Sequence, residues 1–193
     1  MRKLIYYVST TLDGFIANED GSFEGFSWDD NFMADLLAEF PETIPAHLKE
    51  QSSSQDQNKV FDTVLMGRKT YEVALQKGIT NPYPTLDQYV FSHKMDNSQD
   101  ENITLVSEDA IKMVQSLKNK QGKAIWLCGG ADLAGQMLEK NLIDRLIVKL
   151  NPVVFGSGIS LFSGGVQPKD LKLTESKAYK SSHIMLYYLV GRS

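Results

Sequence analysis

Apolar and polar residues follow two rhythms along the first three-quarters of the chain, and these rhythms predict where strands and helices lie. Short apolar runs, typical of buried strands, cover residues 3–9, 61–66, 88–92, 103–106, 124–128 and 143–150. Apolar residues spaced three or four positions apart predict helices at 29–40, from 68 onward, at 108–119 and at 131–140. Because strands and helices alternate, we expect right-handed crossovers and an α/β fold with a largely parallel sheet covered on both faces.

The C-terminal part of the chain has a different pattern. Residues 171–175 alternate between apolar and polar side chains, residues 184–190 form a strongly strand-like run, and residues 180–182 have the composition of a turn. We therefore expect an antiparallel hairpin to close the sheet. Residues 46–59 are the most polar stretch and are predicted only as a solvated helix end or a loop. No repeat or linker divides the sequence, so we expect a single domain over residues 1–193.

The charge balance argues against a nucleic-acid partner. The 193 residues carry a net charge of −4 at pH 7. Their basic side chains are scattered among acidic ones, whereas binding to nucleic acid needs a concentrated basic face. The N-terminal apolar run ends at Ser9 and is too short for a signal peptide or a membrane span, so we expect no membrane partner either.

Cysteine and histidine usage excludes two further classes of site. Cys128 is the only cysteine, which leaves no intramolecular disulfide and no cysteine-based zinc cluster, and we expect a cytoplasmic location. The three histidines, His47, His93 and His183, are dispersed without the spacing of metal ligands. We therefore expect no metal site.

Two strand ends carry the candidate chemistry. The strand at 61–66 stops at Gly67 and is followed by Arg-Lys-Thr at the start of a helix, and a later strand runs into Gly129 and Gly130 before the next helix. Each turn presents free N–H groups and the positive end of a helix dipole to an anion, and two such corners suit a dinucleotide. Each also has an ordinary interpretation, as the solvated first turn of a helix or as plain Gly-Gly turn geometry.

The residues after Gly67 favour a particular dinucleotide. Cations at a helix N-terminus oppose the helix dipole at a cost of roughly a few tenths of a kcal/mol, and a bound anion offsets that cost. Arginine can fork onto a phosphate while lysine adds a point charge, so Arg68 and Lys69 suit the 2′-phosphate of NADPH. Ser92, followed by His93 and Lys94, can form a third polar corner of this pocket or an ordinary polar loop.

Two common nucleotide-binding motifs are absent from the Gly129 corner. Gly130 and Gly135 have the spacing of a P-loop, but Gln136 and Met137 stand where lysine and serine or threonine are required. The three-glycine pattern of dinucleotide-binding βαβ units also fails at this turn. What remains is close backbone approach to a ligand at a helix N-terminus.

The order and spacing of several motifs resemble the dihydrofolate reductase superfamily over nearly the whole chain. The segments that carry the resemblance are Ser9–Ala17, Val64–Glu72, the strand ending at Ser92, and Trp126–Gly130 with its helix. Leu12–Gly14 and Asn151–Gly158 look more like the branch formed by the reductase domain of riboflavin biosynthesis. The resemblance implies a three-layer sandwich with an eight-stranded, mostly parallel mixed sheet, NADPH across the strand ends, and a homodimer.

Cofactor positions follow from the same resemblance. It assigns the edge of the nicotinamide to Ser9, Ile16 and Ala17. It assigns the phosphates to Gly67, Arg68, Lys69 and Thr70, with Ser92 on the adenosine phosphate side. It assigns the pyrophosphate to Gly129, Gly130, Ala131 and Leu133.

The substrate side departs from the folate enzymes, because the segment after Trp28 lacks their proline. If the helix begins near Asp29, this residue shares a row with Met33 and Leu37 on the apolar face, while Asp35 points to solvent. Asp29 is therefore the candidate carboxylate of the substrate pocket, and its alternative role is a helix N-cap.

Two more side chains are predicted at the substrate, and a third has a choice of roles. Trp28 and Phe32 are expected to wall the substrate. Asp13 can orient the substrate, or can simply make a turn with Gly14.

These observations predict an NADPH-dependent reductase that transfers a hydride to a C=N or C=O bond of a small substrate, with a nearby acid or water supplying the proton. Three alternatives stay open: a true dihydrofolate reductase, a riboflavin-pathway reductase, and an NADPH-binding protein without catalysis. The zinc deaminase domain of the bifunctional riboflavin enzymes has no counterpart in this sequence.

Overall fold

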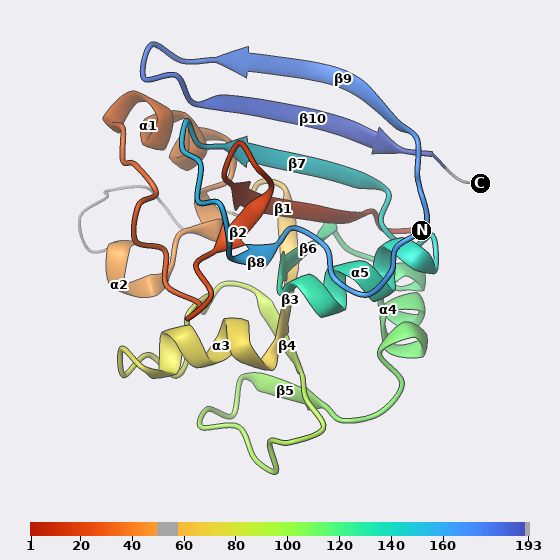
Figure 1. Ribbon diagram of the computed structural model, residues 1–193. Helices are drawn as coiled ribbons and strands as arrows, with labels where there is room; N and C mark the ends of the chain where they lie inside the picture. The colour runs from red at the N-terminus through yellow and green to blue at the C-terminus, as the bar shows by residue number, and fades with distance from the viewer. Residues whose placement is uncertain (50–57, 192–193) are drawn as a thin grey trace.

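Eight strands form one mixed sheet in the order β5-β4-β3-β6-β1-β7-β10-β9 in the computed structural model of the chain, which describes residues 1–49 and 58–191 (Figure 1). The strands of this sheet are β1 Leu4–Thr10, β3 Phe61–Gly67, β4 Asp87–Phe91, β5 Ile103–Val106, β6 Ala124–Gly129, β7 Arg145–Leu150, β9 Leu171–Ala178 and β10 Ile184–Val190. Neighbours from β5 to β7 are parallel, and β10 is antiparallel to both β7 and β9. A separate ribbon pairs β2 Phe15–Ala17 with β8 Ile159–Ser160.

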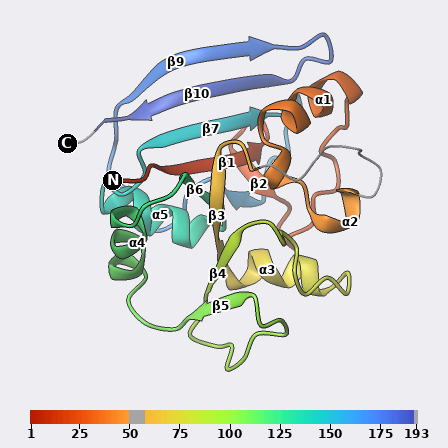
Figure 2. The same ribbon diagram turned by 180° about the vertical axis from the view of Figure 1, so that it is seen from behind.

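Helices cover both faces of the sheet (Figures 1 and 2). They are α1 Asp30–Glu39, α2 Ala46–Lys49, α3 Arg68–Leu75, α4 Ala110–Asn119 and α5 Ala131–Glu139, with a 3₁₀ turn, η1, at Pro41–Thr43. The buried side chains of α1 and α3 join one core cluster, and those of α4 and α5 join the other. Within the described residues, no helix combines the length and apolarity needed to span a membrane.

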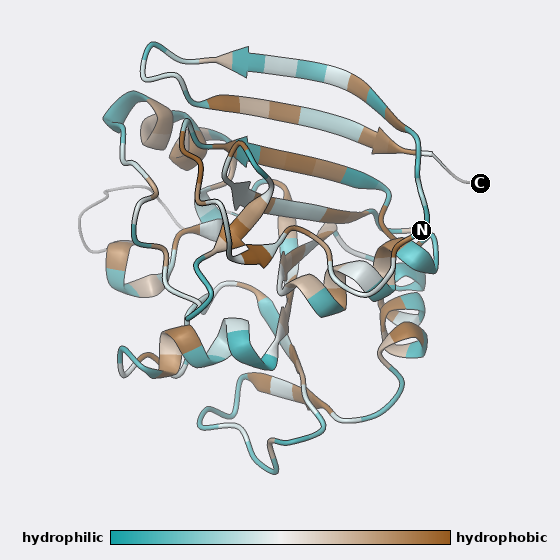
Figure 3. Cartoon of the chain, viewed as in Figure 1, coloured by the Kyte–Doolittle hydropathy of each residue, from teal (hydrophilic) through white to brown (hydrophobic). Residues whose placement is uncertain are grey.

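The central strand β1 shows why the sequence forms this sheet. Ile5 and Tyr7 enter one core cluster, and Tyr6 and Val8 enter the other. A parallel strand that is buried on both faces is expected to be apolar at nearly every position rather than at alternate ones. Figure 3 shows the same feature in β7, which is apolar over its middle.

The expected fold class is confirmed, including the three layers, the mostly parallel eight-stranded sheet and the antiparallel C-terminal hairpin. Two helices begin one or two residues later than predicted, at Asp30 and Ala110, because Asp29 and Asp109 act as their N-caps. Of the polar stretch at 46–59, the first four residues form α2, and residues 50–57 lie outside the described part of the chain.

The apolar C-terminal strand lies inside the sheet. β10 pairs with β7 on one side and with β9 on the other, so β9 forms the edge, and all eight of its residues are exposed. A neighbouring strand therefore pairs with the apolar run at 184–190 on each side, and the run gives no support to a homodimer.

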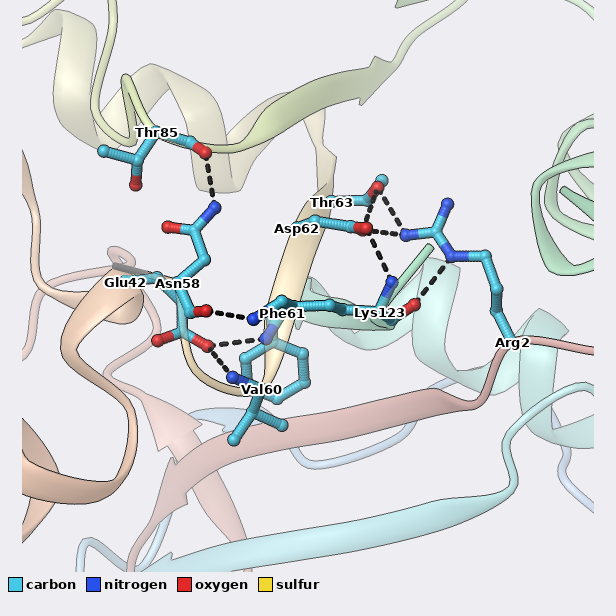
Figure 4. A network of polar contacts seen from close by, with 9 residues as sticks. All are labelled: Arg2, Glu42, Asn58, Val60, Phe61, Asp62, Thr63, Thr85 and Lys123. Atoms are coloured by element: carbon cyan, nitrogen blue, oxygen red, sulfur yellow. Dashed lines mark hydrogen bonds and ion pairs between the residues drawn. The ribbon is translucent and has the colours of Figure 1, made fainter. Parts of the chain in front are cut away.

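A buried carboxylate fixes the start of β3 (Figure 4). Glu42, in η1, is 1% exposed. Its Oε1 accepts hydrogen bonds from Val60 N at 2.7 Å and Phe61 N at 2.5 Å, and its Oε2 accepts one from Lys59 N at 3.1 Å. These bonds satisfy backbone groups that would otherwise be buried without a partner. The element that follows α1 therefore positions the first residues of a central strand.

On the other side of the same strand, Arg2 links the N-terminus to β3 and β6. Its guanidinium forms an ion pair with Asp62, donates to Thr63 Oγ1 at 2.7 Å, and donates from Nε to Lys123 O at 2.7 Å (Figure 4). Asp62 also accepts a hydrogen bond from Lys123 N at 2.6 Å. Glu42 and Arg2 therefore both hold strands at their amino ends, at the edge of the sheet opposite the glycine corners.

Glu42→Gln is expected to destabilise the fold by about 1–3 kcal/mol, because an amide offers one acceptor oxygen and turns a donor toward backbone N–H groups. Urea unfolding followed by circular dichroism measures the change. Glu101→Gln, at an exposed position, is the matched control and should leave the midpoint unchanged. Equal midpoints for Glu42→Gln and the wild type would contradict the role of this carboxylate.

Candidate functional site

The two glycine corners lie side by side at the carboxyl edge of the sheet. β3 and β6 are parallel neighbours, with Met66 opposite Gly129 (Figure 1). A Cβ added to Gly67 would lie 3.2 Å from Gly130 N, and one added to Gly129 or Gly130 would lie 3.5 Å from Thr70 Oγ1. Gly129 has a φ of +143°, which favours glycine. The structure therefore brings four of the predicted cofactor residues into one place.

Both helices that start at this edge lack a side-chain cap. α3 follows Gly67 and α5 follows Gly130, and no side-chain hydrogen bond caps either helix. By contrast, Asp29 caps α1 and Asp109 caps α4. The first-turn N–H groups of a helix have no acceptor within the helix. In α3 and α5 they can bind an external acceptor such as phosphate.

Arg68 forms an ion pair within its own helix. Its Nη1 donates to Glu72 Oε1 at 2.6 Å, four residues further along α3. The pair compensates part of the unfavourable position of a cation at the helix start. The charge argument for a bound anion is therefore weaker than the sequence indicated for Arg68. Lys69 is exposed, and within residues 1–49 and 58–191 no ion pair involves it.

Ser92 lies next to this corner, because Phe91 pairs with Gly67 across β4 and β3. Its side chain serves the local turn: Oγ accepts hydrogen bonds from Lys94 N and Met95 N, both at 3.0 Å, and the residue is 7% exposed. The ordinary polar loop predicted as the alternative therefore explains the hydrogen bonds that the Ser92 oxygen accepts. A contact with the adenosine phosphate stays a prediction.

The residues predicted at the nicotinamide lie two strands away from the Gly67 corner. Ser9 is near the carboxyl end of β1, and β2 carries the half-buried Ile16 and the buried Ala17. The sheet order β3-β6-β1 means that a ligand extended from the start of α3 crosses the end of β6 before it reaches Ser9. This path fits the elongated shape of a dinucleotide.

The start of α5 packs tightly, which limits what its residues can offer. Leu133 lies in the core at 6% exposure, and Ala131 O accepts a hydrogen bond from Ser163 N at 3.2 Å. These two predicted residues can contact a ligand only through backbone N–H groups. A Cβ on Gly135 would lie 2.0 Å from Ser163 O, so close packing accounts for the glycine that gave a P-loop spacing.

Asp13 joins two loops that are far apart in the sequence. Its carboxylate accepts hydrogen bonds from Thr11 Oγ1 at 2.6 Å, Gly156 N at 2.7 Å and Phe155 N at 3.1 Å. The Thr11 hydroxyl and these backbone N–H groups lower the pKa of Asp13. The structure therefore gives Asp13 a structural role that goes beyond the turn with Gly14. Both of its carboxylate oxygens accept hydrogen bonds within the protein.

The capping alternative for Asp29 is confirmed. Its Oδ1 accepts a hydrogen bond from Phe32 N at 2.8 Å. Trp28 is 67% exposed, and its Nε1 donates to Asp30 Oδ1 at 3.2 Å. These contacts occupy both groups locally, and their roles at a substrate stay predictions.

The apolar face predicted for the helix at 29–40 is confirmed. Phe32, Leu36 and Phe40 are buried, Met33 packs against the same core cluster, and Leu37 is half-buried. Phe32 is 4% exposed and stacks on the His183 ring, with centroids 4.6 Å apart. Phe32 is therefore a core residue rather than a wall of the substrate site.

Sequence reasoning missed a cluster of three ionisable side chains beside Ser9. Lys149, near the carboxyl end of β7, pairs in register with Ser9 of β1, and its Nζ lies 4.1 Å from the centre of the Tyr7 ring. Burial lowers the pKa of Lys149 to about 8 and raises that of Cys128 to about 11, and the Tyr83 hydroxyl lies beside the Cys128 thiol. The sequence feature that could have revealed this cluster is Lys149 itself, a lysine within the otherwise apolar run of β7.

Other parts of the described chain offer less. An apolar cavity of about 150 Å³ lies between α5 and β10, where Ile143, Leu146 and Val190 place it at the amino end of β7. It is therefore at the opposite edge of the sheet from the glycine corners. Among the described residues, no three His, Cys, Asp or Glu side chains gather closely enough to hold a metal ion.

The family follows from comparison with known proteins. A model of the RibD C-terminal domain matches residues 2–185. This chain belongs to the RibD C-terminal domain family. The chain is 34% identical over 190 residues to the uncharacterized protein YwjB of Bacillus subtilis (strain 168), and the alignment covers 97% of this chain and 98% of YwjB.

Solved structures of similar fold include RibD-like and folate enzymes. A putative riboflavin biosynthesis protein from Shewanella sp. PV-4 superposes with a TM-score of 0.71 at 22% identity, covering 98% of this chain and 99% of that one. A Thermotoga maritima deaminase and 5-amino-6-(5-phosphoribosylamino)uracil reductase gives 0.65 at 13% identity, covering 98% and 57%. Dihydrofolate reductase from Enterococcus faecalis, complexed with NADP(H), gives 0.65 at 14% identity, covering 98% and 97%. The expected resemblance to both groups is confirmed, and in this RibD-family chain the same fold positions the glycine corners.

Lys149→Met is expected to raise the melting temperature at pH 7. The folded-state pKa of Lys149 is about 8, below its ordinary 10.5, so between these values the unfolded chain binds more protons and wild-type stability rises with pH. The advantage of the variant should therefore shrink from pH 8 to about pH 10.5. Differential scanning fluorimetry across this range measures it. Lys112→Met, at a side chain 83% exposed, should show no such trend, and parallel curves for all three proteins would contradict the prediction.

Proposed function

We propose that this chain is an NADPH-dependent reductase that transfers a hydride to a C=N or C=O bond of a small heterocyclic or ribosylated substrate. The observation that carries the proposal is the pair of adjacent helices, α3 and α5, which begin at glycines without side-chain caps at the carboxyl edge of the sheet. Membership of the RibD C-terminal domain family supports it. The NADP(H) complex of the similarly folded Enterococcus faecalis enzyme supports the choice of cofactor.

In this proposal the first-turn N–H groups of α3 and α5 bind the phosphates. Arg68 has five N–H donors, so its bond to Glu72 leaves others for a 2′-phosphate, and Lys69 adds a second charge. NADPH supplies the hydride when bound. Ser9 and the β2 ribbon then border the reacting ring and limit its contact with water, which is the protein's share of such chemistry.

A ribosylated pyrimidine is our proposed substrate class, because the Thermotoga maritima protein of the same fold is described as a 5-amino-6-(5-phosphoribosylamino)uracil reductase. Dihydrofolate is a less suitable substrate. A folate site needs a buried carboxylate, but Asp29 caps α1, and Asp35 forms an ion pair with Lys177 of β9 rather than only facing solvent. An NADPH-binding protein without catalysis is the remaining alternative.

Three further features belong to the same proposal. A single reductase domain over residues 1–193 and a cytoplasmic location are expected from the sequence, and a homodimer is implied by the resemblance. The exposed edge strand β9 leaves a homodimer sterically possible at that edge. Light scattering of the purified protein distinguishes one copy from two.

Arg68→Ala is expected to weaken NADPH binding by roughly ten- to a hundredfold, the usual worth of a hydrogen bond to a charged group, and to leave NADH binding nearly unchanged. Isothermal titration calorimetry with both nucleotides measures this. Lys77→Ala, just beyond the C-terminal end of α3, is the control. If neither nucleotide binds below about 1 mM, NADPH dependence is refuted, and equal effects on both nucleotides would refute only the 2′-phosphate contact.

Single-turnover oxidation of NADPH tests catalysis and substrate together. We expect oxidation with 5-amino-6-(5-phosphoribosylamino)uracil and none with dihydrofolate, because Asp29 and Asp35 are held by other partners within the protein. Absorbance at the nicotinamide band reports the reaction. Tight NADPH binding without oxidation by any pterin, pyrimidine or quinone would instead favour the non-catalytic alternative.

A further inference from the structure

Lys149 is a half-buried ammonium group at the reactive end of the proposed site. It lies near the carboxyl end of β7, an interior strand between β1 and β10, where Ser9 and Met185 are its register partners. Its side chain lies on the same face of the sheet as Tyr7 and Cys128. Both of these residues pack in the core cluster that α1 covers. The residue after Cys128 is Gly129, so Lys149 stands beside both the nicotinamide edge and the second glycine corner.

Among the described residues, the groups identified around Lys149 are aromatic, apolar or neutral. β1 contributes the face of the Tyr7 ring, β6 contributes Cys128, β10 contributes Met185, and Tyr83 lies beside Cys128. Burial raises the pKa of Cys128 to about 11, so the thiol is neutral at physiological pH. In the described part of the chain, no carboxylate or carbonyl oxygen accepts a hydrogen bond from Lys149 Nζ.

The acidic residues nearest Tyr7 are held by other partners. Glu39 of α1 accepts a hydrogen bond from the Tyr187 hydroxyl at 2.8 Å, and Glu42 accepts its bonds from the start of β3. Both lie near the Tyr7 hydroxyl rather than beside Lys149. The ammonium group therefore keeps its donors for a molecule that enters the site.

Lys118 shows what a structural lysine looks like in the same protein. It is 2% exposed, and its Nζ donates to Leu142 O at 2.6 Å and forms an ion pair with Asp144. An enclosed charge of this kind is tolerated because it has acceptors. Lys149 is more open to solvent and lacks such acceptors in residues 1–49 and 58–191. Its ammonium group packs against the face of the Tyr7 ring, but a hydrogen-bond acceptor of the kind that holds Lys118 is missing from the described residues.

We propose that Lys149 contacts the substrate and donates the proton that completes the reduction. This inference rests on the proposed NADPH-dependent function. The substrate it selects carries a hydrogen-bond-accepting atom at, or next to, the bond that is reduced. The two carboxylates considered from the sequence are less suited to this role, because Asp13 and Asp29 are bonded to backbone N–H groups.

In the reduction of a C=N bond, Lys149 would supply the proton that the nitrogen needs. As the hydride from NADPH bonds to the carbon, the π electron pair moves to the nitrogen, which takes a proton from Nζ. The products are a C–H bond, an N–H bond, the oxidised nicotinamide nucleotide and a neutral Lys149 amine, which regains a proton from water. A pKa of about 8 suits a general acid near neutral pH.

Variants at Lys149 test the proton step with 5-amino-6-(5-phosphoribosylamino)uracil as the probe. Lys149→Met should lower the single-turnover rate by roughly 10²- to 10⁴-fold, the usual contribution of a general acid, without changing NADPH affinity. Lys149→Arg keeps the charge but is a poor acid, so it should retain probe binding and lose the fall in rate above about pH 8. Lys112→Met is the control and should match the wild type.

Trace acetylation of the NADP⁺-loaded protein, read by mass spectrometry, gives an answer that needs no turnover. Labelling of Lys149 should titrate near pH 8 and slow at least tenfold when the probe is added, while labelling of Lys112 stays constant. Undiminished labelling of Lys149, or a full rate in Lys149→Met, overturns the inference about Lys149 alone. Failure of the wild type to bind NADPH overturns the proposed function instead.

Discussion

The parallel pairing of β3 with β6 is the constraint on which the candidate site depends. It sets Gly67 against Gly130 and directs two helix N-termini to the same edge of the sheet. Neither corner alone differs from an ordinary strand-to-helix turn. Together they bring two helix N-termini without side-chain caps side by side, so close that a Cβ at Gly67 would lie 3.2 Å from Gly130 N. The chemistry of this edge is therefore a product of strand order.

Strand order also explains why the site has two chemically different ends. The β3 end carries Arg68 and Lys69 and faces solvent, while the β7 end carries Lys149 among aromatic and apolar groups. A charge in the open interacts weakly because water screens it, whereas a charge in an enclosed site interacts strongly. The β3 end is therefore suited to binding a phosphate, and the β7 end to acting on the bond that is reduced in the proposed reaction.

Hydrophobic pattern was sufficient to predict most of the fold, because both faces of the sheet are covered and its inner strands are apolar throughout. The order of the strands was not predicted, since the hydrophobic pattern carries no information on which strands are neighbours. The role of Asp29 could not be decided from the sequence, because a helix N-cap and a pocket carboxylate both place an acidic residue at the start of α1. Lys149 was missed because a strand buried on both faces gives no sign of which side a single polar residue faces.

The hydrogen bonds of Asp13 limit how the lengths of two loops, at residues 11–14 and 153–161, can change. Its carboxylate binds the backbone at Phe155 and Gly156, Leu12 N donates to Val153 O at 2.8 Å, and Leu161 N donates to Gly14 O at 2.9 Å. Two loops separated by some 140 residues are thus joined at three consecutive residues of the first loop. Their lengths are coupled, because an insertion in one would shift its donors out of register with the acceptors of the other. Diversity in this part of the molecule has to arise through side chains, or through paired changes in both loops.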